Sequence, residues 1–126
     1  MIENQENELT LIYHSDKEED KKMLAFVEAM DKYVTKNLNL KRQTLTETQL
    51  AEIADKMELP IAELLDESYI DRAPLENLLQ SRMMSPGDLL TLLSQNPLLL
   101  ATPIVIVGTK AYKYRSAFEI IKEISR

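Results

Sequence analysis

The sequence predicts an α/β fold built as a single domain. Short apolar runs of strand length occur near both ends of the chain, and apolar residues between them recur at the spacing of amphipathic helices. Several helix starts are marked by a capping residue followed by glutamate or glutamine at the capping-box spacing. The 126 residues are enough for one hydrophobic core and too few for two ordinary domains.

The first part of the chain predicts two strands, each followed by a helix. Residues 9–13 are apolar at positions that face both sides of a sheet, which is typical of a central strand. Asp16, with Glu19 at the capping-box spacing, predicts the start of a helix. Residues 33–40 predict a second strand, and residues 46–49 (Thr-Glu-Thr-Gln) repeat the capping box before a second helix.

The middle of the chain predicts further helices. Pro60 and Pro74 each suit the first turn of a short helix, because the ring of proline removes an N–H that would have no partner there. Ser85 as a cap, with Pro86 at the first helical position, predicts another helix. That helix should end near Gln95, because a proline follows shortly afterwards.

The last part predicts a hairpin and a final helix. Residues 104–107 are β-branched and predict a strand, Gly108 and Thr109 a turn, and residues 110–114 a returning strand. Ser116, with a glutamate at the capping-box spacing, predicts the start of the last helix.

Composition excludes several classes of function. The chain has no cysteine, which rules out disulfides, thiolate metal sites and thiol catalysis. Its net charge of −6 opposes binding to a phosphate backbone, so no direct nucleic-acid role is expected. The longest apolar run is too short and too broken by proline to cross a bilayer. We expect a soluble cytoplasmic protein, with a disordered tail at residues 1–7 and one domain at residues 8–126.

Two motifs resemble those of the arsenate reductase (ArsC)/Spx family. In the first motif, a predicted helix ends at Asn-Pro and is followed by an apolar link and a strand that begins Thr-Pro-Ile-Val; the whole run reads LLSQNPLLLATPIVIV. The second motif is LIYHS, which covers the first predicted strand and the two residues after it. The order of elements is also that of thioredoxin-like folds. The resemblance extends from about Glu8 onward. It implies a thioredoxin-like fold: a four-stranded mixed sheet flanked by helices, with a helical insertion between the second and third strands.

The resemblance gives the Thr102–Pro103 pair a role. In thioredoxin-like folds the corresponding proline is cis, and the residue before it offers main-chain groups to a bound peptide or thiol ligand. An X-Pro bond can be held in cis at low cost. The alternative is that Pro103 is a trans proline that opens an edge strand.

The chain departs from the family at the positions that carry its chemistry. The family's nucleophilic cysteine falls on Glu18, and its anion-binding arginine falls on Thr102. The region after Leu65 that often supplies a basic residue reads Asp66-Glu67. The resemblance therefore implies that both the thiol and the oxyanion site are lost. A helix N-terminus attracts anions, and we expect acidic residues of the chain to occupy it: Asp16, Glu18, Glu19 and Asp20.

Other candidate site residues have simpler interpretations. His14 could act as a base, but a lone histidine without a nearby nucleophile favours a structural role. Residues 18–20 could bind a metal, but adjacent helical side chains diverge, which favours stabilisation of the first turn. Met83 and Met84 could be exposed. We therefore predict no catalytic residue, no metal site and no cofactor. The predicted contacts to a ligand or partner are His14, Ser15, Thr102 and Pro103.

A basic group near the last predicted strand has two interpretations. It comprises Lys110, Lys113 and Arg115, with Tyr112 and Tyr114 between them. It could bind an acidic ligand. Charged residues on an edge strand also prevent pairing with other chains, and that protection would give the same pattern.

The predicted function is a non-catalytic ArsC/Spx-like binding or regulatory module that has lost thiol redox chemistry, with a protein as its partner. One alternative is a Spx-like partner of the transcription machinery that acts through protein contacts. The other is an enzyme that holds glutathione or a related thiol through Thr102 main-chain groups, while the substrate supplies the sulfur.

Overall fold

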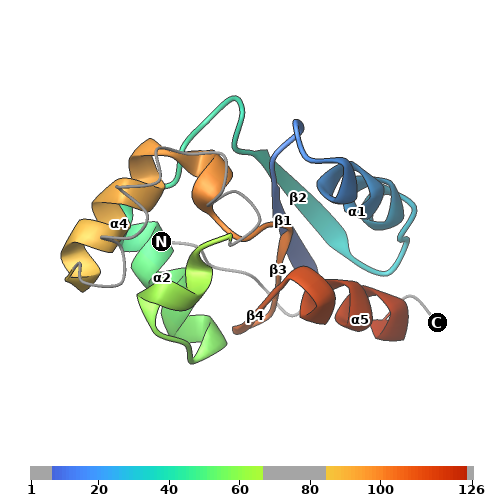
Figure 1. Ribbon diagram of the computed structural model, residues 1–126. Coiled ribbons are helices and arrows are strands. Elements are labelled where there is room, and N and C mark those ends of the chain that lie inside the picture. The colour runs from blue at the N-terminus through green and yellow to red at the C-terminus, as the bar shows by residue number, and fades with distance from the viewer. Residues whose placement is uncertain (1–6, 67–84, 125–126) are drawn as a thin grey trace.

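The computed structural model describes residues 7–66 and 85–124, which form a four-stranded mixed sheet with helices on both faces (Figure 1). The strand order is β2-β1-β3-β4. β1 pairs in parallel with β2 and antiparallel with β3, and β3 pairs antiparallel with β4. The strands are β1 (Glu8–Tyr13), β2 (Val34–Asn39), β3 (Ile104–Val107) and β4 (Lys110–Lys113). The predicted mixed sheet is confirmed.

β1 is an internal strand of this sheet, as its apolar pattern predicts. Leu9 and Leu11 point to one face and Ile12 to the other, and all three are fully buried. In the register with β3, Leu11 lies opposite Val105 and Ile12 opposite Ile104. The C-terminal end of β1 therefore lies beside the N-terminal end of β3.

The helices cover the two faces of the sheet separately (Figure 1). α1 (Glu18–Glu28) and α5 (Tyr114–Ile124) pack on one face, and α2 (Glu47–Met57) and α4 (Pro86–Gln95) on the other. The core under α1 and α5 consists of Leu9, Leu11, Met23, Val27, Val105, Ala117 and Ile121. The core under α2 and α4 includes Ile12, Leu50, Ile53, Leu64, Leu93, Leu100, Ile104 and Ile106.

The predicted helical insertion between β2 and β3 is confirmed, and its end is tied to the chain that leads into β3. Besides α2 and α4, the described residues of the insertion form two short 3₁₀ helices, η1 (Ile61–Leu64) and η3 (Pro97–Leu99). The Asp66 N–H donates to the Leu99 carbonyl at 2.7 Å, and the Ala101 N–H to the Leu64 carbonyl at 2.7 Å. These bonds place the Asp66 side chain beside the segment that precedes β3.

Two predicted helix starts are confirmed. The Thr46 hydroxyl accepts a hydrogen bond from the Gln49 N–H at 3.1 Å, and the Gln49 side chain accepts one from the Thr46 N–H at 2.9 Å. The Ser85 hydroxyl accepts from the Asp88 N–H at 3.2 Å. As predicted, α4 begins at Pro86 and ends at Gln95.

Two other predicted caps are wrong. The N-cap of α1 is Lys17, not Asp16, because the Asp16 carboxylate turns outward to accept a hydrogen bond from the Lys41 ammonium at 2.8 Å. α5 starts at Tyr114 and is not capped by Ser116. The chain turns directly from β4 into α5 at Tyr114, whose φ is +51° and whose N–H donates to the Pro103 carbonyl at 3.0 Å. Because of that long-range bond, α5 begins earlier in the chain than the predicted cap at Ser116.

Some predictions concern residues outside the described part of the chain: the helix starting at Pro74, the exposure of Met83 and Met84, and most of the N-terminal tail. Of that tail only Asn7 is described, and its carbonyl accepts a hydrogen bond from the Val34 N–H at 2.8 Å. No helix within residues 7–66 and 85–124 has the length and apolar character needed to span a membrane.

Candidate functional site

The candidate site lies where the loop after β1 meets the segment before β3. β1 and β3 are antiparallel neighbours, so the end of one strand and the start of the other share an edge of the sheet. The loop carries His14 and Ser15, and the segment carries Thr102 and Pro103. The Thr102–Pro103 peptide bond is cis, which confirms that prediction. The four residues predicted as ligand or partner contacts therefore come from two segments that meet at one end of the sheet.

Among the residues that the structure describes, five buried polar or charged side chains gather around this point, and we refer to them as the buried polar cluster. Lysine and aspartate are almost never fully buried unless they are paired, so a group of such side chains requires internal partners. The members, with their exposed fractions, are His14 (5%), Lys17 (7%), Asp20 (1%), Asp66 (2%) and Thr102 (1%).

The ammonium group of Lys17 is central to the buried polar cluster. It donates hydrogen bonds to Asp66 Oδ2 at 2.9 Å and to the Leu100 carbonyl at 2.8 Å. Charge-assisted bonds of this kind are about twice as strong as neutral ones. Through Lys17 the start of α1 is joined to the end of η1 and to the segment that leads to the cis peptide.

Asp20 is the second buried carboxylate of the cluster. Its Oδ2 accepts a hydrogen bond from the His14 main-chain N–H at 2.9 Å. Burial raises the pKa of Asp20, while the neighbouring Thr102 hydroxyl, the His14 N–H and the charge of Lys17 act in the opposite direction. Asp20 Oδ1 and Thr102 Oγ1 are both buried on the side of the cluster that faces the cis peptide, where the Thr102 hydroxyl acts on the Asp20 carboxylate.

His14 is held as part of the loop. Its Nδ1 accepts a hydrogen bond from the Asp16 N–H at 3.1 Å, which requires an unprotonated Nδ1 and places the ring proton of the neutral form on Nε2. Burial lowers the pKa of His14, and the nearby Asp16 carboxylate opposes this shift. The His14 carbonyl accepts from the Lys17 N–H at 3.0 Å. The histidine thus forms a compact turn that brings the Lys17 side chain inward.

Of the four acidic residues expected at the helix end, Glu18, Glu19 and Asp20 lie in the first turn of α1, and Asp20 is the one that is buried. Asp16, Glu18 and Glu19 each pair with a surface lysine, at nitrogen–oxygen distances of 2.8, 2.9 and 3.2 Å. Charges that have no buried partner remain in water because desolvation is costly. Glu18, at the position predicted for the family nucleophile, is 80% exposed and does not join the cluster. No group of three histidine, aspartate or glutamate side chains suited to a metal ion occurs in the described residues.

The cluster leaves little access to the cis peptide. Thr102 is 1% exposed and Pro103 is buried, whereas Ser15 is half-buried. A ligand could reach the Thr102 main chain only if the surrounding side chains moved. The site offers no thiol, because the chain contains no cysteine.

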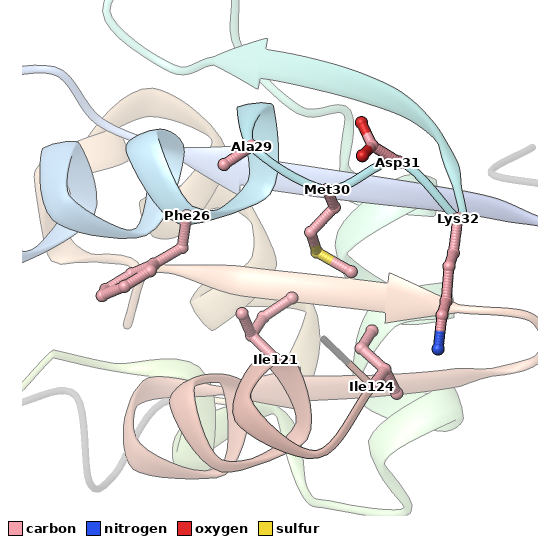
Figure 2. Close-up of a pocket in the computed structure, with 7 residues that line it drawn as sticks. All are labelled: Phe26, Ala29, Met30, Asp31, Lys32, Ile121 and Ile124. Atoms are coloured by element: carbon pink, nitrogen blue, oxygen red, sulfur yellow. The ribbon is translucent and has the colours of Figure 1, made fainter. Parts of the chain in front are cut away.

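A separate hollow lies at the opposite end of α1. A groove of about 290 Å³ runs between α1 and α5 and is lined mainly by apolar side chains. Figure 2 shows Met30 pointing toward Ile121 and Ile124, with Phe26 at the outer side of the groove. This groove starts two turns of helix beyond Asp20, so it is not part of the buried polar cluster.

Sequence reasoning missed Lys17 and misjudged Asp66. The sequence pattern presents Asp66 only as the loss of a basic residue, whereas in the structure its carboxylate accepts a hydrogen bond from the Lys17 ammonium. The sequence does contain a signal that Lys17 has a role in the tertiary fold. A cation at the N-terminal end of a helix is unfavourable for the helix dipole, and lysine is not a capping residue. Its presence there indicates that a contact elsewhere in the fold determines the residue.

Solved structures share this fold. An arsenate reductase from Vibrio cholerae is 16% identical, with a TM-score of 0.73 and coverage of 94% of this chain and 98% of that one. A protein assigned as an arsenate reductase from Yersinia pestis is 19% identical, with a TM-score of 0.72 and coverage of 90% and 98%. An ArsC-family-related protein from Bacteroides fragilis is 14% identical, with a TM-score of 0.72 and coverage of 93% and 99%.

These matches confirm the predicted resemblance at the level of the fold. The chain has the thioredoxin-like architecture of ArsC-family proteins over nearly its whole length. No family model matches the sequence, and no curated protein matches it.

Proposed function

We propose that this chain is a non-catalytic member of the ArsC-like fold group that acts as a binding or regulatory module. The observation that carries the proposal is the ion pair between Lys17 and Asp66, buried at the end of α1 in a chain without cysteine. The pair fills the space between the loop after β1 and the segment before the cis peptide. The absence of a thiol and the presence of this pair both argue against redox chemistry.

The chemistry of the family position supports the same proposal. Reduction of arsenate or of a disulfide by a thiol requires a sulfur nucleophile that forms a covalent intermediate. Glu18 at that position is a carboxylate, exposed and paired with Lys21. It has no sulfur to contribute to such an intermediate. What remains is a stable surface around Ser15 and Glu18 that a cytoplasmic protein partner could contact.

The catalytic part of the proposal is tested by assaying the purified chain for reduction of arsenate and of a mixed disulfide. Glutathione, glutaredoxin and an NADPH-coupled regeneration system are supplied, and we expect no turnover above the rate without the chain. Calorimetry with glutathione is run in parallel, and we expect no saturable heat. Turnover that scales with the amount of chain would refute the proposal. Saturable glutathione binding would favour an enzyme in which the substrate supplies the sulfur.

The binding part is tested by photo-crosslinking in cells. A photo-reactive side chain replaces Glu18, the exposed first residue of α1, and a control probe replaces Glu47, the exposed first residue of α2. We expect a discrete protein adduct from the first position and none from the second. Recovery of RNA polymerase in that adduct would identify the transcription machinery as the partner. Equal labelling at both positions, or none, would contradict a partner surface at this end of α1.

A further inference from the structure

A second surface, which shares no residue with the buried polar cluster, brings positive charge to the edge of the sheet. β4 lies between α2 and α5 (Figure 1). A groove of about 400 Å³ is lined by residues from the end of α2 and from β4. We call it the β4 groove. Its charged lining consists of Lys56 and Glu58 from the end of α2, with Lys110 and Lys113 from β4.

The β4 groove differs in charge from the molecule as a whole. Three lysines face one glutamate there, whereas the chain carries a net charge of −6. Lys113 also lies 4.0 Å from the Glu63 carboxylate and donates to the Glu63 carbonyl. Neither Lys56 nor Lys110 forms an ion pair with a described residue. Cations gathered in a groove raise the local concentration of an anionic partner.

The backbone of β4 provides a second kind of contact. In the described sheet β4 has one strand neighbour, β3, so it is an edge strand. An edge strand presents N–H and C=O groups to which an extended segment can pair as an added strand. Leu59, which is 37% exposed, and the half-buried Tyr112 give the groove an apolar contact surface.

Protection of the edge does not account for all of these features. Charged residues on the strand itself are sufficient to block pairing, and the opposite edge strand, β2, carries Lys36 in an ion pair with Glu8 at 2.6 Å. The β4 groove adds Lys56 and Leu59 from a different element, and it is hollow. Protection would not require a cation or an apolar side chain across the groove.

We propose that the β4 groove binds an extended acidic peptide segment of a partner protein, which pairs with β4 and places its carboxylates against Lys56 and Lys110. A peptide fits better than a nucleic acid, because it can satisfy the strand backbone and because the overall negative charge repels a long polyanion. This inference does not depend on the proposed function, since the groove shares no residue with the buried polar cluster. Failure of the Glu18 crosslinking experiment would leave it intact.

The test is a titration with a fluorescein-labelled peptide of alternating glutamate and valine, about six residues long, the usual length of a strand. Anisotropy is measured with the wild-type chain and with the Lys56→Gln/Lys110→Gln double variant. The control is Lys36→Gln/Lys122→Gln, which removes the same charge at exposed positions outside the groove. We expect saturable binding that the groove variant weakens about three- to tenfold and the control weakens less than about twofold.

Two further measurements decide what occupies the groove. First, the amide chemical shifts of Ala111 to Lys113 should change when the peptide is added to the isotope-labelled chain. Second, a peptide with proline at alternate positions should bind more weakly, because it lacks the N–H groups that pair with a strand. A single-stranded oligonucleotide of the same charge serves as the competing probe. The proposal would be overturned by any of four outcomes. These are a peptide that does not bind saturably, an equal loss of affinity in both double variants, β4 amides that do not shift, and an oligonucleotide that binds more tightly than the peptide. Circular dichroism of both variants verifies that they fold.

Discussion

The residues at the N-terminal ends of α1 and α2 make opposite kinds of contact: those of α2 are local, and those of α1 are distant in the sequence. α2 is capped by the exposed Thr46, whose hydroxyl and main chain exchange hydrogen bonds with Gln49 three residues away. α1 has Lys17 at the equivalent position, with no side-chain cap. Its side chain runs inward to Asp66 and Leu100, which lie 49 and 83 residues away in the sequence.

The comparison separates local stabilisation from stabilisation by the tertiary fold. The cap of α2 satisfies free N–H groups of its own helix and would do so in isolation. The contacts of Lys17 satisfy groups of other segments and exist only when the whole domain is formed. Four predictions follow from this difference, in order of decreasing expected effect.

The largest effect is expected from Lys17→Met, which keeps the length of the side chain but removes the ammonium. The buried Asp66 carboxylate would lose its bond to this ammonium, and removing one partner of a buried ion pair costs about 3–5 kcal/mol. Urea denaturation at neutral pH measures the loss. Lys21→Met is the matched control, because Lys21 is 50% exposed and pairs with Glu18 at the surface; we expect a change below about 1 kcal/mol.

A double variant sharpens the same test. Adding Asp66→Asn to Lys17→Met also removes the charge of the carboxylate that has lost the Lys17 ammonium, so the double variant should be more stable than Lys17→Met alone. If the two losses instead add, the cost of Lys17→Met comes from packing, and the ion pair does not anchor α1.

A smaller effect is expected from Thr46→Ala. The change removes the hydroxyl that caps α2, which costs about 1 kcal/mol of unfolding free energy. Gln49→Ala removes the reciprocal half of the capping box and should cost less, since the Thr46 hydroxyl bond remains. A loss for Thr46→Ala as large as that for Lys17→Met would show that both helix ends depend on the tertiary fold.

Asp20→Asn should stabilise the domain in a pH-dependent way. Burial raises the pKa of Asp20 in the folded chain, so the contribution of this carboxyl is favourable below its unfolded value of 3.8 and is lost as the pH rises through the folded value. Asparagine keeps an acceptor for the His14 N–H and carries no charge. The gain in stability of Asp20→Asn over wild type should therefore grow from pH 3 toward neutral pH. Thermal melts at a series of pH values measure this gain.

Asp55→Asn, at an exposed position of α2, is the control for the loss of one carboxylate. A constant difference between Asp20→Asn and wild type across the pH range would mean that burial does not determine the protonation of Asp20.

The smallest difference is expected between Glu18→Cys and Glu47→Cys, which place a thiol at the first residue of each helix. Both positions are exposed, and acidic neighbours at α1 oppose the effect of the helix dipole on a thiolate. We expect both thiols to titrate near the ordinary value of about 8.5, followed by thiolate absorbance. A pKa below about 7 for Glu18→Cys alone would show that the end of α1 still activates a nucleophile.

Features with local signals could be predicted from the sequence. The capping box at Thr46 and the Ser85–Pro86 start of α4 depend on neighbouring residues, and both are confirmed. The cis bond at Pro103 was predicted from a motif that resembles a known family. The four-stranded mixed sheet was expected from that resemblance and not from periodicity.

Features that depend on distant contacts could not be predicted. Asp16 looks like a cap, but Lys41 from beyond β2 draws its carboxylate outward. The start of α5 is fixed by a bond from Tyr114 to Pro103. The pairing of Lys17 with Asp66 depends on how the helical insertion folds back, which no local pattern encodes. The buried polar cluster was therefore the least predictable part of the molecule.

The three-way contact of Lys17 also has a consequence for motion. Because one ammonium joins the loop after β1, the end of η1 and the segment before β3, none of these segments can open without breaking a bond to the others. We therefore expect their amides to open as one cooperative unit in hydrogen exchange. The loop after the first strand should then be more protected than a loop that opens on its own.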